Sequence, residues 1–142
     1  MISKPLKILL IEDDEGHATL IQMNLRDAGI TNRIEHISDG QSAVDYLDNL
    51  HENKRSPLLI LLDLNLPVLD GYGVLKILKS NAATKKIPII ILTSSDDQRE
   101  IDRCYELGCN VYLRKPINYN EFVHAVKQLG VFISIIEVTV GS

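Results

Sequence analysis

The chain has 142 residues, of which 45% are hydrophobic and 24% are charged, and its formal net charge is −4. This length fits one domain with one core, and the lack of a basic excess argues against nucleic-acid binding. The longest apolar runs are far too short to cross a bilayer, and the first residues contain no apolar stretch of signal-peptide length. We therefore expect a cytoplasmic protein with no membrane and no direct nucleic-acid partner.

Five short segments rich in apolar and β-branched residues recur along the chain and predict strands. They cover 7–11, 33–37, 58–62, 87–92 and 110–114. The third and fourth are continuous apolar runs, as expected for central strands of a parallel sheet that is buried on both faces.

Segments with helical periodicity separate these strands. The fourth helix is expected from about 96 to 107, ending before Gly108, and the fifth begins at Asn118, a good N-cap. The expected apolar stripes contain Leu20, Met23, Leu25 and Ala28 in the first helix, and Val74, Leu75, Ile77 and Leu78 in the third.

Strands and helices thus alternate five times, which predicts an α/β fold with a parallel sheet covered by helices on both faces. The common doubly wound order for five strands is 2-1-3-4-5, the flavodoxin-like arrangement. No composition shift or linker divides the chain. We expect one domain over 1–130, followed by an apolar C-terminal extension at 131–142.

Acidic residues follow the two strands that meet where this strand order reverses. Glu12, Asp13 and Asp14 follow the first strand, and Asp63 follows the third. Open parallel sheets bind ligands at this point, outside the carboxyl ends of the strands. Clustered carboxylates repel each other, and a hard cation such as Mg²⁺ relieves the repulsion through oxygen ligands. The pattern predicts a Mg²⁺ site in which Asp63 is an aspartyl nucleophile.

Helix capping is the competing interpretation for some of these acids. Asp14 is better explained as the N-cap of the helix that begins near Glu15. Asp13 fits a cap and a metal ligand about equally well. Asp63 fits a cap poorly, because the next helix begins only near Asp70 or Gly71.

The fourth and fifth strands add two further groups at the same end of the sheet. Thr93 ends the fourth strand, and Lys115 follows the fifth. Each alone reads as an ordinary strand threonine or loop lysine. Together they supply a hydroxyl and an ammonium that can neutralise a phosphoryl group beside a metal–carboxylate site.

These motifs, read together, resemble the response-regulator receiver family of two-component signalling. The matching pieces are LLIEDD, LLDLNLPVLDG, PIIILTSS and VYLRKP, in that order, and the resemblance extends to about Gly130. Within the family, the PINYNEF segment and the apolar tail look like the small stand-alone regulators that are paired with cyanobacterial phytochrome-type kinases.

The resemblance implies a role for each acidic position. Glu12 and Asp13 match the family's paired acids, with Asp13 the closer metal ligand and Glu12 acting through water. Asp63 matches the phosphoacceptor, and Asn65 matches the position whose backbone carbonyl binds the metal.

The resemblance also implies how the site responds. Thr93 matches the hydroxyl that contacts the phosphoryl group, Lys115 the family's lysine, and Tyr112 the aromatic residue that changes rotamer on activation. The phosphoryl group would come from a sensor histidine kinase or a small phosphodonor. The surface formed by the fourth helix, fifth strand and fifth helix would then switch, and the chain would catalyse only its own phosphotransfer and dephosphorylation.

Other functions fit the residues less well. A haloacid-dehalogenase-type phosphatase also uses an aspartyl nucleophile and Mg²⁺, but it needs an acid where this chain has Asn65. A flavodoxin-like electron carrier would need a Ser-, Thr- and Gly-rich loop after the first strand, where this chain is acidic. A nucleotide-binding P-loop motif is absent.

An apolar pattern with a repeating four-three spacing, typical of a coiled-coil seam, runs from the fifth helix into the C-terminal extension, through Phe122, Val126, Leu129, Ile133, Ile136 and Val140. Left exposed, it would form an apolar patch larger than monomers usually tolerate. We expect a homodimer through this segment, with a strand or a fold-back onto the same domain as the alternatives. The expected interface residues are Phe132, Ile133, Ile136 and Val140.

Overall fold

The computed structural model describes residues 5–50 and 57–128. Five strands and five helices alternate along this part of the chain, as predicted. In chain order they are β1 (Lys7–Ile11), α1 (Glu15–Asp27), β2 (Ile34–Ile37), α2 (Gly40–Asp48), β3 (Leu58–Leu62), α3 (Gly71–Ser80), β4 (Ile89–Thr93), α4 (Gln98–Leu107), β5 (Val111–Arg114) and α5 (Tyr119–Gln128).

The strands form one parallel sheet in the order β2-β1-β3-β4-β5, which confirms the predicted flavodoxin-like fold. Ile11 pairs with Leu62, so the residues that follow β1 and β3 leave the sheet side by side. Thr93 pairs with Arg114, which brings the end of β4 next to the residue before Lys115. The register therefore gathers the predicted site residues at one edge of the sheet.

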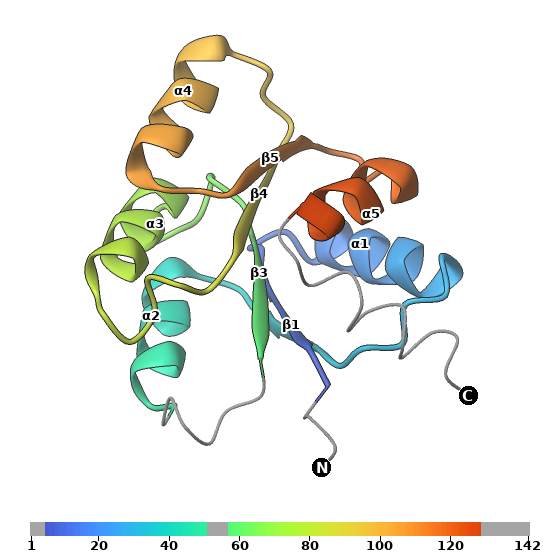
Figure 1. The fold of residues 1–142 in the computed structure, drawn as a ribbon, viewed down its shortest axis with the longest axis horizontal. Helices are drawn as coiled ribbons and strands as arrows, with labels where there is room; N and C mark the ends of the chain where they lie inside the picture. The colour runs from blue at the N-terminus through green and yellow to red at the C-terminus, as the bar shows by residue number, and fades with distance from the viewer. Residues whose placement is uncertain (1–4, 51–56, 129–142) are drawn as a thin grey trace.

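Helices cover both faces of the sheet. α2, α3 and α4 lie on one side, and α1 and α5 lie on the other (Figure 1). Alternate residues of the central strands point into two separate cores. Leu9 and Ile60 belong to the core under α2 to α4, whereas Ile8 and Leu59 belong to the core under α1 and α5.

The predicted apolar stripe of α1 is wrong in part. Leu20 and Met23 are 48% and 55% exposed, whereas Ala18, Ile21 and Leu25 are buried against the sheet. The buried positions follow an i, i+3, i+7 spacing, which keeps them on one narrow face of the helix. The helix contacts the sheet only along that face, so neighbouring apolar positions stay outside. Ile77 of α3, also expected in a stripe, is likewise exposed.

Several helix boundaries confirm the capping interpretation. The side chains of Asp14 and Asp70 accept hydrogen bonds from the first turns of α1 and α3, and Asn118 does the same for α5. α4 begins at Gln98, two residues later than predicted, because the side chain of Asp97 caps it. Gly108 ends α4 with a φ of 105°, a conformation that glycine adopts without strain.

Residues 129–142 lie outside the described residues, and with them the predicted interface residues Phe132, Ile133, Ile136 and Val140. Among the described residues, no helix has the length and apolar character needed to cross a membrane.

Candidate phosphorylation and metal site

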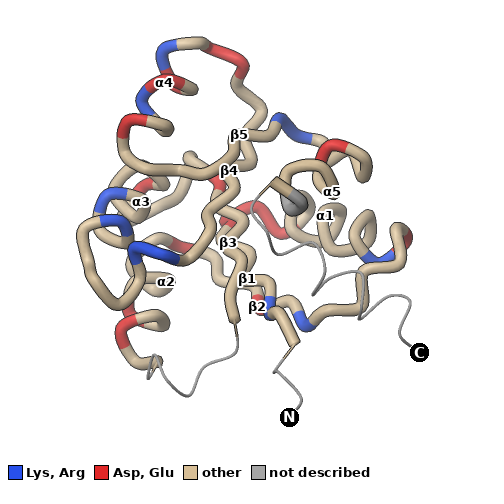
Figure 2. The backbone as a smooth tube through the Cα atoms, viewed as in Figure 1, with Lys and Arg blue, Asp and Glu red and all other residues tan. Residues whose placement is uncertain are grey.

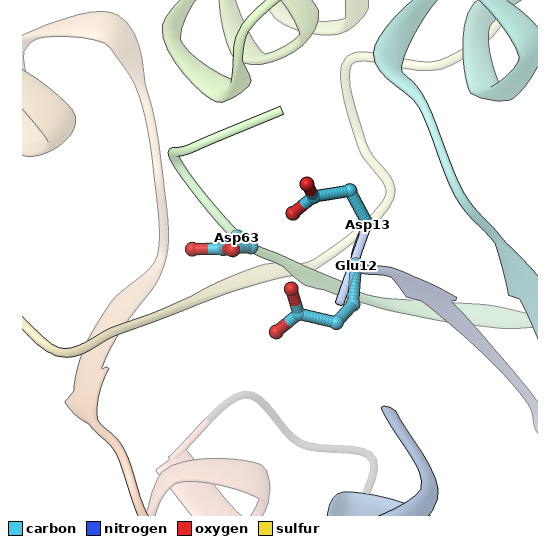
Figure 3. A group of neighbouring side chains, drawn as sticks. All are labelled: Glu12, Asp13 and Asp63. Atoms are coloured by element: carbon cyan, nitrogen blue, oxygen red, sulfur yellow. The ribbon is translucent and has the colours of Figure 1, made fainter. Parts of the chain in front are cut away.

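Three acidic side chains meet where β1 and β3 end. Carboxylate oxygens of Glu12, Asp13 and Asp63 all lie within 4.8 Å of one another, and their side chains turn toward a common space (Figure 3). Acidic positions are also visible at the ends of these two strands in Figure 2. The carboxyl ends of parallel strands point the same way, so the fold itself forces these charges together.

Lys115 provides a cation for this cluster. Its Nζ pairs with Oε1 of Glu12 and lies 3.4 Å from Oδ2 of Asp63. Glu12 and Asp63 are only 1% and 6% exposed, whereas Asp13 is exposed. One ammonium therefore faces two buried carboxylates and a third at the rim. This arrangement leaves negative charge that a further cation can neutralise.

The environment raises the pKa of the Asp63 carboxyl to about 6. The largest cause is burial, followed by a hydrogen bond with Glu12, while the charge of Lys115 and the backbone N–H of Asn65 act in the opposite direction. A carboxylate that is poorly hydrated and next to other acids is costly to keep ionised. A cation bound here would favour the ionised form, which is the nucleophilic one.

The donor set fits a hard divalent cation. All three clustered groups are carboxylates, and Asp13 and Asp63 approach from different strand ends with Asp13 open to solvent. Mg²⁺ binds one or two protein carboxylates while keeping several waters, so this geometry suits it. The backbone of Asn65 lies beside the Asp63 carboxylate, although the Asn65 side chain faces solvent.

Thr93 ends β4 and is 1% exposed. Its backbone carbonyl accepts the Lys115 N–H at 2.9 Å, which joins the β4 end to the loop before α5. Its Oγ1 lies 3.5 Å from the backbone nitrogen of Ser95. Thr93 and Lys115 thus come from neighbouring strands at the same edge as the acids. The cis bond between Lys115 and Pro116 lies directly after them.

Tyr112 of β5 is half-buried and packs against the core under α2 to α4. Its hydroxyl donates a 2.7 Å hydrogen bond to the Ser95 carbonyl, two residues after Thr93. Burial is the main cause that raises the pKa of Tyr112 to about 12, so the hydroxyl keeps its proton. Both predicted switch residues therefore contact Ser95, a residue that the sequence motifs did not single out.

His17 is a further residue of the site that the sequence patterns missed. Its Nδ1 lies 3.4 Å from Lys115 Nζ and 3.9 Å from Glu12 Oε1. It lines a cavity of about 320 Å³ together with Ser94, Lys115 and Ile117. Its position in the first turn of α1, directly after the acidic strand end, was the available signal.

Known proteins are similar to this chain in sequence and in fold. A family profile for "Response regulator receiver domain" matches residues 8–127. Response regulator Rcp1 of Synechocystis is 37% identical over 130 residues, which cover 90% of this chain and 88% of Rcp1. A receiver domain from Rhodospirillum rubrum superposes with a TM-score of 0.73 at 50% identity, covering 91% of this chain and 94% of that one.

Two further solved structures are similar to this chain. The bacteriophytochrome response regulator AtBRR is 35% identical with a TM-score of 0.79, covering 93% of this chain and 96% of its own. The receiver domain of sensor histidine kinase PA1611 from Pseudomonas aeruginosa, with magnesium in its active-site cleft, is 32% identical with a TM-score of 0.72. That likeness covers 91% of this chain and 99% of the PA1611 domain.

These matches extend over nearly the whole described chain, and they contradict the alternative of a haloacid-dehalogenase-type phosphatase. They agree with the acidic cluster, the strand order and the paired lysine that the structure shows. The chain belongs to the response regulator receiver domain family, whose members are phosphorylated on an aspartate.

Proposed function

We propose that Asp63 is the phosphoacceptor of this receiver domain. One observation carries the assignment: Asp63 is a buried strand-end carboxylate that lies 3.4 Å from the Lys115 ammonium and belongs to the acidic cluster. Glu12 is also buried, but its carboxylate is paired with Lys115 and is not accessible from solvent. Asp13 is exposed and lacks the desolvated setting of Asp63.

The phosphotransfer follows from this geometry. A carboxylate oxygen of Asp63 attacks the phosphorus of a phosphohistidine, the new O–P bond forms, and the P–N bond breaks with its electron pair moving to the imidazole, which then takes a proton from water. Lys115 places its positive charge beside the oxygens of the transferred group. The Thr93 hydroxyl at the neighbouring strand end donates to one of these oxygens.

Mg²⁺ is the cation that this site is proposed to hold. Asp13, Asp63 and the backbone carbonyl of Asn65 would bind it, and Glu12 would act through a water because Lys115 already engages it. When bound, the ion neutralises charge on the phosphoryl oxygens. Support comes from the oxygen-only donor set and from the magnesium-bound receiver domain that resembles this chain.

Incubation with acetyl phosphate and Mg²⁺, followed by intact mass measurement, tests both assignments. The wild type should gain one phosphoryl group, and Asp63→Asn should gain none. Asp13→Ala should stay folded by circular dichroism and lose Mg²⁺-dependent labelling. Unchanged labelling of Asp63→Asn would move the phosphoacceptor to another residue, and full labelling of wild type in excess chelator would remove the metal from the proposal.

The proposed partner is a sensor histidine kinase of the bacteriophytochrome type, acting in the cytoplasm. The likeness to Rcp1 and to AtBRR supports this choice, and the net charge of −4 gives no reason to expect nucleic-acid binding. The chain would transform no substrate other than its own phosphoryl group. Transfer of radioactive phosphate from a purified phytochrome kinase, compared with a kinase of another input class at equal concentration, would test the pairing.

Phosphorylation is proposed to alter the face formed by α4, β5 and α5. Thr93 would move toward the phosphoryl group and Tyr112 would follow the space that it leaves, so a local charge change biases a two-state element. Thr93→Ala should still be labelled by acetyl phosphate but should not show the labelling-dependent change in partner binding. Normal coupling in Thr93→Ala would place the relay elsewhere.

Residues 131–142 are proposed to form a homodimer contact, with 1–130 as the receiver domain. The support is the sequence alone. A four-three-four-three-four spacing links Phe122, Val126, Leu129, Ile133, Ile136 and Val140, and Phe132 lies next to this apolar seam. A two-fold dimer would cover this apolar surface. Light scattering should give a dimeric wild type and a monomeric double variant of Phe132→Asp with Ile136→Asp. A monomeric wild type would refute the dimer.

A further inference from the structure

A chain of side-chain contacts joins the first turns of α3 and α4, outside the acidic cluster. At its centre is Ser95, between β4 and α4. The Ser95 hydroxyl donates to the carboxylate of Glu100, its carbonyl accepts from Tyr112, and its backbone nitrogen faces Thr93 Oγ1. Ser95 therefore contacts both switch residues and is itself held by α4.

The Glu100 contact is not ordinary helix capping. Glu100 is the third residue of α4 after the N-cap Asp97, a position from which glutamate usually reaches back to the N–H of the cap. In this structure the Asp97 N–H donates instead to Ser95 Oγ at 3.2 Å. The Glu100 carboxylate is directed to that same hydroxyl, so it restrains the loop and not the helix end.

Glu100 also contacts α3. The Glu100 carboxylate lies near enough to the Tyr72 side chain to interact with its hydroxyl. The Arg103 guanidinium lies 4.0 Å from the centre of the Tyr72 ring. Burial first, and then the charge of Glu100, raises the pKa of Tyr72 to about 12. α4 carries both signs of charge in Figure 2, and Glu100 with Arg103 form the part of it that meets Tyr72.

Tyr72 in turn lies next to the strand end that carries Asp63. The preceding residue, Gly71, donates its N–H to the Leu64 carbonyl at 2.9 Å. A side-chain carbon at Gly71 would lie 2.3 Å from the Asp63 carbonyl oxygen, so the first turn of α3 is packed directly against the residue after β3. The ends of β3 and β4 are therefore both linked by contacts to the Glu100 carboxylate, the first through α3 and the second through Ser95.

We propose that Glu100 is a positioning residue of the phosphorylation switch, and that its carboxylate clamps Ser95 of the β4–α4 loop to Tyr72 of α3. This inference rests on the proposed phosphorylation of Asp63. The clamp resists movement of Thr93 toward a phosphoryl group, because Ser95 must shift with it. Removing the clamp lowers the cost of that movement and favours the phosphorylated arrangement.

Labelling of variants tests the effect on the switch. Ser95→Ala and Glu100→Ala should each lower the acetyl phosphate concentration that gives half-maximal labelling, roughly threefold to tenfold. The double variant should show no further change, because both substitutions break one contact. Glu100→Gln keeps a side-chain oxygen that can accept hydrogen bonds from the hydroxyls of Ser95 and Tyr72. This variant should therefore need the same acetyl phosphate concentration as the wild type for half-maximal labelling. Glu106→Ala, an exposed glutamate on the same helix, is the matched control and should label like wild type.

A readout that does not need phosphorylation keeps the two proposals separate. The five tyrosines can be replaced by 3-fluorotyrosine and their ¹⁹F resonances assigned with Tyr→Phe variants. Ser95→Ala should move the Tyr72 resonance through Glu100, and Glu106→Ala should not. An unmoved Tyr72 resonance in Ser95→Ala overturns the clamp, even if Asp63 is labelled normally. Additive labelling effects of Ser95→Ala and Glu100→Ala overturn it as well.

A wild type that acetyl phosphate does not label would reject the proposed function, although the contact of Glu100 with Ser95 and Tyr72 could still exist. In that outcome the clamp no longer positions a phosphorylation switch, so the inference is overturned in its functional part. Normal wild-type labelling with non-additive variants, rescue by Glu100→Gln and a moved Tyr72 resonance is the result that supports it.

Discussion

Two partly buried lysines at opposite ends of the sheet show how differently the fold treats the same charge. Lys79 lies near the amino ends of β4 and β5, where its Nζ donates to the carbonyls of Lys85 and Ile87 and to the side-chain oxygen of Asn110. Lys115 lies at the carboxyl ends and pairs with the carboxylates of Glu12 and Asp63. Both lysines join neighbouring strands to a loop or helix.

The difference lies in what remains after the lysine is satisfied. The contacts of Lys79 are all to neutral oxygens, and burial lowers the pKa of its ammonium. Around Lys115 the carboxylates outnumber the ammonium, and burial raises the pKa of Asp63. At the amino ends of the strands, the contacts of Lys79 therefore serve to hold the strands, loop and helix together. The carboxyl end retains unbalanced charge, which a cation and a phosphoryl group can use.

The largest expected effect comes from replacing Lys115. Lys115→Met should lower the rate of labelling by acetyl phosphate about 100-fold or more, because it removes the charge beside the transferred group. Lys79→Met should label at the wild-type rate, which is the matched control for removing a partly buried lysine. Equal labelling rates in the two variants would erase the distinction between the two ends.

The next effect concerns stability and pH in the absence of metal. The folded pKa of Asp63 is about 6, above its ordinary value of 3.8, so the folded protein binds the extra proton between these values. Stability conferred by that proton is present at low pH and is lost as pH rises from about 4 to 6. At pH 7.5, Asp63→Asn should therefore be more stable than wild type by roughly 1 to 3 kcal/mol.

Urea unfolding in EDTA at pH 5 and pH 7.5 measures this difference, which should be smaller at pH 5. Adding Mg²⁺ should stabilise the wild type more than Asp63→Asn, since the ion binds the carboxylate. Identical stability of the two proteins at pH 7.5 without metal would show that the acidic cluster stores no unfavourable energy.

At the amino end the expected sign is reversed. Lys79→Met should destabilise the fold by about 1 to 2 kcal/mol, because partly buried carbonyls lose their donor. The measurement is urea unfolding at pH 7.5. Lys76→Met, an exposed lysine on the same helix, serves as the control and should stay near the wild-type stability. A more stable Lys79→Met would mean that the free-energy cost of burying this ammonium exceeds the stabilisation from its three hydrogen bonds.

The smallest expected effect concerns backbone strain in a loop at the carboxyl end of the sheet. Val68, in the loop between β3 and α3, is 86% exposed and has a φ of 70°, which is unfavourable for a β-branched residue. Val68→Asn should raise the unfolding free energy by about 1 kcal/mol, because asparagine tolerates this conformation. Val68→Ala keeps a side-chain carbon in the same conformation and should gain less. No gain in Val68→Asn would show that this loop carries no strain.

Much of the site was predictable because strand order and chain order together specify where strands end. The acids after β1 and β3, Thr93 at the end of β4 and Lys115 after β5 are all predicted to lie at one edge of the sheet, and the structure brings them together there. The apolar stripe expected for α1 was wrong in part. Periodicity indicates that a helix has an apolar side, but it does not indicate how wide a contact the sheet makes with that side.

The sequence by itself determined the α/β fold, the strand order and the residues at the carboxyl ends, since each depends on local pattern and on a small set of allowed topologies. Only the tertiary structure decided which partners those residues take. Lys115 engages Glu12 as well as Asp63, His17 approaches that lysine, and Ser95 joins Tyr112 to Glu100. Such contacts depend on how helices and loops pack across the sheet, and the spacing of residues along the chain does not predict that packing.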